Sequence, residues 1–103
     1  MELIPKYDES KGDFEDQAPC WVPTVDRDGN KLKPIIVCNC GKITGIGLHH
    51  VHTDGTVTAS YYHKKGNEYP EDPNGCEWHV WLKLLDYNEG DFPSVPLEKL
   101  NKL

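Results

Sequence analysis

Cysteine and histidine residues form two short clusters whose spacing is typical of metal ligands. Cys38 and Cys40 make the first pair, and Cys76 and His79 make the second with a Cys-x-x-His spacing. Zinc is usually held tetrahedrally by thiolates and imidazoles, and a single turn of chain can present two of them. The sequence therefore predicts one structural Zn²⁺ site formed by Cys38, Cys40, Cys76 and His79.

Two glycines adjoin these clusters, Gly41 after the first pair and Gly75 before the second. Glycine adopts backbone angles that strain other residues, so we expect both to shape turns whose N–H groups point at sulfur. Cys20 and His63 are the fallback ligands, because either can replace one of the four favoured side chains.

Two other interpretations of the cysteines stay open at this point. Four reduced cysteines can behave as small hydrophobic residues in a core. A disulfide framework fits less well, because Cys38 and Cys40 are too close in sequence to pair without strain.

A histidine cluster offers a rival metal site. His49, His50 and His52 share one predicted strand and His63 lies on the next, with Asp54 in the turn between them. Histidines with one carboxylate and an open position would suit a small metal-dependent enzyme. However, no general base, nucleophile–base pair or phosphate-binding glycine motif is identifiable. We therefore favour exposed histidines, and we expect no catalytic residues and no organic cofactor site.

The segments that must position these ligands have the composition of β-strands. We predict strands over 35–37, 42–53, 56–63 and 76–85. Asp54-Gly55 is a typical hairpin turn, and Asp28-Gly29 is a second turn signal. A helix is the competing interpretation of 76–85, where two tryptophans and a valine favour a strand. The expected fold is mainly β: a small antiparallel sheet of β-hairpins pinned by a structural zinc, with irregular termini.

Two ligand pairs joined by antiparallel strands over residues 34–87 resemble a zinc ribbon. The size, acidity and motif layout are also similar to uncharacterised zinc-ribbon-like proteins of bacteriophage genomes. The resemblance implies a structural metal in a small β domain. Zinc ribbons as a class serve many functions, so the resemblance indicates no particular one.

The length of 103 residues predicts one folded domain with two less regular ends. We expect residues 1–19 to be an acidic arm, extended or partly disordered, because acidic side chains, Pro5, Gly12 and Pro19 dominate it. Residues 20–90 form the expected zinc-ribbon-like domain. Residues 91–103 form a tail in which 97–103 can make a short helix. Most aromatic side chains are expected in the core, whose 37% hydrophobic content is low.

Charge restricts the classes of partner. The net charge of −6 argues against a nucleic-acid-binding zinc ribbon, which stays the third hypothesis, and against an anionic membrane surface. No apolar run has membrane length and no secretory signal is evident, so we expect a reducing cytoplasm. The favoured function is a non-enzymatic, zinc-stabilised module that binds another protein through a strand edge, the 64–74 loop or the acidic arm. A dimer through exposed strand edges is a further option.

Overall fold

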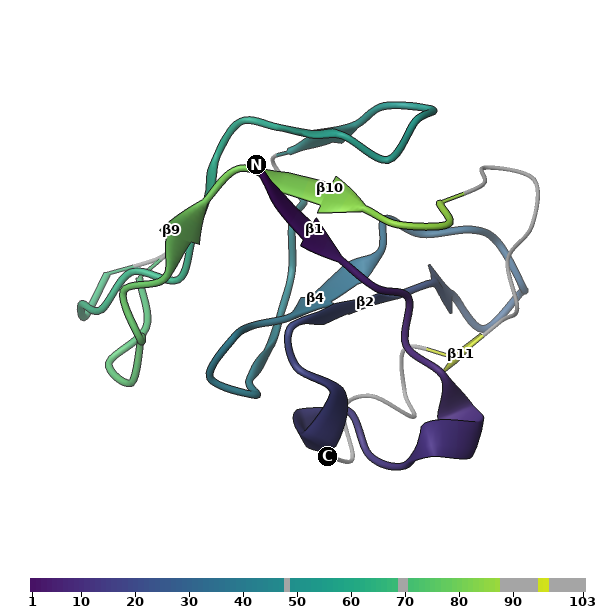
Figure 1. Cartoon of the computed structure of the whole chain (residues 1–103), viewed down its shortest axis with the longest axis horizontal. Coiled ribbons are helices and arrows are strands. Elements are labelled where there is room, and N and C mark those ends of the chain that lie inside the picture. The colour runs from purple at the N-terminus through teal and green to yellow at the C-terminus, as the bar shows by residue number, and fades with distance from the viewer. Residues whose placement is uncertain (48, 69–70, 88–94, 97–103) are drawn as a thin grey trace.

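Short strands dominate the computed structural model, which describes residues 1–47, 49–68, 71–87 and 95–96 (Figure 1). Eight prolines and nine glycines interrupt the apolar runs, so that no described strand exceeds three residues. The strands are β1 (Glu2–Ile4), β2 (Cys20–Val22), β3 (Thr24–Val25), β4 (Ile35–Val37), β5 (Ile43–Thr44), β6 (His50–Val51), β7 (Val57–Thr58), β8 (Tyr61–Tyr62), β9 (His79–Val80), β10 (Leu82–Leu84) and β11 (Val95–Pro96).

The strands pair into several small sheets. One is three-stranded and antiparallel, in the order β2–β4–β5, and two further antiparallel pairs are β6–β7 and β8–β9. Two pairs are parallel, β1 with β10 and β11 with β3. The expectation of a mainly β fold is therefore confirmed, although the described strands form several small sheets, mostly antiparallel, where one antiparallel sheet was expected. The predicted run 76–85 forms β9 and β10 rather than a helix.

The acidic segment 1–19 packs onto the rest of the chain. Its strand β1 lies alongside β10 (Figure 1), with Ile4 opposite Leu84. Both of these side chains are fully buried. Two single-turn 3-10 helices follow, η1 (Glu9–Lys11) and η2 (Glu15–Gln17). A few apolar side chains thus anchor a segment whose overall composition suggested an extended or partly disordered arm.

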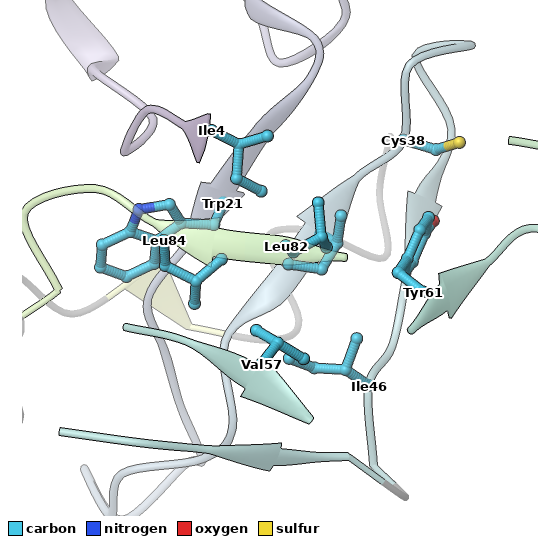
Figure 2. Packing of buried hydrophobic residues seen from close by; sticks show 9 residues of the cluster. Ile4, Trp21, Cys38, Ile46, Val57, Tyr61, Leu82 and Leu84 are labelled. Carbon is cyan, nitrogen blue, oxygen red and sulfur yellow. The ribbon is translucent and has the colours of Figure 1, made fainter. Parts of the chain in front are cut away.

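The main core gathers apolar side chains from both ends of the described chain (Figure 2). Its buried members are Ile4, Trp21, Ile36, Cys38, Ile46, Val57, Tyr61, Leu82 and Leu84. Trp21 is the largest of these side chains, and its indole N–H donates to the carbonyl oxygen of Leu85 at 2.8 Å. Trp78 packs against this core from a half-buried position, whereas Trp81 is 53% exposed. Two of the three tryptophans therefore serve the core, and the third faces solvent.

No helix in the described residues has the length and apolar composition needed to cross a membrane. Strand β11 pairs with β3 in register Val95 to Thr24. The short helix expected over 97–103 lies outside the described residues.

Candidate metal centre

Three cysteines and one histidine converge at one end of the main core. The ligand atoms of Cys38, Cys40, His63 and Cys76 all lie within 4.8 Å of one another, so this group can hold a metal ion. Cys38 Sγ is 3.3 Å from Cys76 Sγ, and His63 Nδ1 is 3.5 Å from Cys40 Sγ and 3.4 Å from Cys76 Sγ. Figure 2 shows Cys38 beside Tyr61 at the edge of the core.

The first pair of cysteines is positioned by the turn that connects β4 to β5. The N–H of Gly41 donates to the carbonyl oxygen of Cys38 at 2.7 Å, and the N–H of Cys38 donates to that of Lys42 at 2.8 Å. Gly41 has φ of 89°, a conformation that glycine adopts without a Cβ clash. The backbone N–H of Cys40 bonds to the sulfur of Cys38, so the turn supports a thiolate there.

Cys76 reaches the site from the other side, after the 64–74 loop. A Cβ at Gly75 would lie 2.4 Å from the carbonyl oxygen of Lys64, so this position tolerates only glycine at such a close approach. The chain then turns at Glu77, whose φ is 65°. The backbone N–H of Trp78 bonds to the sulfur of Cys76. Cys38 and Cys76 thus share one arrangement, in which the backbone N–H two residues further along the chain faces the thiol.

His63 completes the group from the end of β8. Its ring is 6% exposed, and Nε2 lies 2.9 Å from Asp72 Oδ2. Because a carboxylate accepts, Nε2 carries the proton and the lone pair of Nδ1 faces the two sulfurs. Asp72 also pairs with Lys42, and hydrogen bonds from Lys42, the Asn74 backbone and His63 hold the pKa of Asp72 well below its usual range.

His79 is not part of this group, although its Cys-x-x-His spacing favoured it. Its Nε2 lies 2.9 Å from Ser60 Oγ, and its ring stacks on Tyr62 with centroids 4.5 Å apart. The left-handed turn at Glu77 redirects the chain after Cys76, and β9 then pairs with β8 in register His79 to Tyr62. That register brings His63, one of the two fallback ligands, to the cysteines.

Cys20, the other fallback ligand, lies elsewhere. It is fully buried in a second apolar cluster with Phe14, Val22 and Val37. Burial raises the pKa of the Cys20 thiol to about 11. This cysteine behaves as a small hydrophobic residue, which the sequence allowed for all four.

The histidines proposed as a rival site are dispersed. His49 Nε2 lies 3.1 Å from the carbonyl oxygen of Ser60, and His52 Nε2 lies 2.8 Å from Thr58 Oγ1. The rings of His50 and His52 lie edge to face, with centroids 4.5 Å apart. His63 is with the cysteines, and across the described ranges no second group of His, Cys, Asp and Glu has metal-binding geometry.

The thiols of the group differ in acidity. Burial raises the pKa of Cys38 to about 12. Burial also opposes ionisation of Cys76, but hydrogen bonds from the Trp78 backbone and from the Cys38, His63 and Cys40 side chains outweigh it and lower its pKa to about 7. Cys76 is therefore the thiol of this pair that ionises near neutral pH, and a thiolate is the form that binds metal.

Comparison with protein-family models, curated proteins and solved structures gives no match for this chain. The resemblance to zinc ribbons and to bacteriophage proteins stays a prediction. The functional argument accordingly rests on the geometry of the site.

Proposed function

We propose that this chain is a non-enzymatic protein-binding module whose β domain is stabilised by one zinc ion bound to Cys38, Cys40, His63 and Cys76. The observation that carries the proposal is the convergence of four donor atoms within 4.8 Å. A tetrahedron with Zn–S near 2.3 Å and Zn–N near 2.0 Å has edges of about 3.5 to 3.8 Å. The S–N separations of 3.4 and 3.5 Å fit this, and the Cys38–Cys76 separation of 3.3 Å is slightly short of it.

Three thiolates and one imidazole form a complete tetrahedral set. Catalytic zinc keeps one position for water or substrate, whereas structural zinc has four protein ligands. The donor set therefore favours a structural role. The ion would join the ends of β4 and β8, which belong to different small sheets, to the chain that follows the 64–74 loop. In a chain with few long strands, such a link stabilises the fold because zinc binding contributes directly to folding free energy.

A protein partner is favoured by charge and by the sheet edges. The net charge of −6 opposes binding to a phosphate backbone. Strands β5 and β8 each have one paired neighbour in the described chain, and unpaired strand edges are sites at which other chains bind.

The metal part of the proposal is tested by measuring bound metal under native and denaturing conditions in a mass spectrometer. We expect one zinc per folded chain, lost on denaturation, and a lower melting temperature after removal by a chelator. A chain that carries no metal, or whose melting curve a strong chelator leaves unchanged, would refute the structural zinc.

A further inference from the structure

Two strand edges lie across a cavity from each other. Strand β5 ends the β2–β4–β5 sheet, and β8 pairs with β9 alone. Between them is a cavity of about 620 Å³, lined by 42–47 on one side and 60–63 on the other. Its volume is within the range of about 300–1,000 Å³ found for ligand sites.

The unpaired backbone groups of β5 point toward this cavity. The N–H of Cys38 donates to the carbonyl oxygen of Lys42 across the turn. Strand β4 pairs antiparallel with β5 in register Ile36 to Thr44. Antiparallel partners alternate between bonded and non-bonded pairs, so Thr44 bonds to β4 and the N–H and C=O of Ile43 face away from it. Within the described chain, no other backbone group bonds to Ile43.

Strand β8 presents the matching edge. The backbone N–H of His63 donates to the carbonyl oxygen of Trp78, and the carbonyl oxygen of His63 accepts from the Glu77 N–H. Because bonded and non-bonded residues alternate along the strand, the N–H and C=O of Tyr62 face away from β9. The carbonyls on either side of Tyr62 along this edge are occupied. The carbonyl oxygen of Ser60 accepts from the His49 ring, and the carbonyl oxygen of Lys64 accepts from the Asp72 N–H. No backbone partner for Tyr62 exists on this edge in the part of the chain that the structure describes.

The space between the edges is held open by Tyr61. Its hydroxyl lies 2.6 Å from Thr44 Oγ1, so the length of a tyrosine side chain separates two strands that would pair directly at about 4.8 Å. Gly45 lines the cavity without a side chain, and a Cβ there would meet nothing within 4 Å. Figure 2 shows Tyr61 and Ile46 among the side chains of the main core.

We propose that this groove binds an extended peptide segment of a protein partner, which adds as a strand between β5 and β8. Free backbone donors and acceptors on both edges are what such a segment requires, and strand addition is a recurrent mode of peptide recognition. The shorter lining segment, residues 60–63, has room beside it for about four residues of an extended peptide at ~3.3 Å each. The segment has no proline opposite Ile43 or Tyr62, because each of these positions needs a backbone N–H from the peptide. This inference rests on the proposed protein-binding function and names the surface that performs it.

The test begins with a display library of random seven-residue peptides, selected on the zinc-loaded full chain. For the best synthetic peptide, amide hydrogen exchange of the chain is followed by NMR. We expect the Ile43 and Tyr62 amides to exchange at least tenfold more slowly with saturating peptide. The Thr44 amide, already bonded to β4, should change little. N-methylation of the central peptide bonds should abolish binding.

Two variants locate the site. Gly45→Val adds a branched side chain at the lining of the cavity and should weaken binding at least tenfold. Trp81→Ala removes an exposed ring that does not line the cavity and should leave affinity unchanged. A library that yields no binder, unprotected Ile43 and Tyr62 amides, or a loss in Trp81→Ala without a loss in Gly45→Val would each overturn the groove. Zinc content is measured in every sample. If zinc is retained and the Ile43 and Tyr62 amides are not protected, the groove alone is refuted. If zinc is absent, the structural metal is refuted.

Discussion

Replacing each of two histidines in turn provides the sharpest test of the metal centre. His63 faces two cysteine sulfurs, whereas His79 contacts Ser60 and Tyr62 near the surface. We expect His63→Ala to weaken zinc binding strongly and His79→Ala to leave it unchanged. Both residues lie on the same pair of strands, β8 and β9 or their immediate ends, so each variant is a control for the other.

The magnitude follows from the number of ligands. Structural zinc contributes about 10–16 kcal/mol of apparent binding free energy, and an equal share for one of four ligands is about 3 kcal/mol. That loss corresponds to a zinc affinity lowered by about 100-fold or more. His79→Ala removes one exposed hydrogen bond and a ring contact, which together cost about 1 kcal/mol of folding stability.

Zinc affinity is measured by competition with a chromogenic chelator, and cobalt substitution reports the donor set. The wild type and His79→Ala should give the same tetrahedral cobalt spectrum, and His63→Ala should lose intensity or shift toward an open geometry. Equal affinities for wild type and His63→Ala would refute the assigned donor set. So would an affinity loss in His79→Ala as large as that in His63→Ala.

Three further changes probe the support of the site and of the fold. Asp72→Asn keeps the size of the side chain but removes the carboxylate that accepts from His63, and it should lower zinc affinity about 10–100-fold. An unchanged affinity in chelator competition would show that this contact is dispensable. Ile4→Ala empties a fully buried position and should cost about 2–5 kcal/mol in denaturant titration with zinc in excess, while the zinc stoichiometry stays at one. A loss below 1 kcal/mol would contradict its place in the core. Gly75→Ala sets a Cβ 2.4 Å from the Lys64 carbonyl and should lower both melting temperature and zinc affinity, whereas Gly45→Ala adds a Cβ in open space. Matching melting curves for the two glycine variants would argue against the close approach.

Local spacing carried most of the information about the cysteines. Cys38 and Cys40 share one turn, and a glycine at Gly41 signals the backbone conformation which that turn requires. Whether His63 or His79 joins them depends on how two strands pair. That register is set by side chains across the sheet and by the left-handed turn at Glu77, neither of which the spacing of ligands records.

The composition of the N-terminal segment did not predict its strand. Acidic residues dominate 1–19, yet Ile4 packs in the main core with Trp21 and Leu82. Backbone hydrogen bonds from Glu2 to Trp81 and from Leu85 to Ile4 then join β1 to β10. Parallel pairing between segments so far apart leaves no local signature. The Asp72 contact with His63 could have been sought, because metal-binding histidines commonly donate their second N–H to a carboxylate.

The parallel pairing of β1 with β10 affects how the chain can fold. Its partners are separated by most of the sequence, so the first strand has no sheet neighbour until residues 82–84 are available. Contacts of such high sequence separation slow folding because a long loop must close before they form. A bound ion that joins Cys38 and Cys76 would shorten that loop in advance. The rate at which the chain reaches its native state is then expected to depend on when the metal arrives, as well as on how tightly it is held.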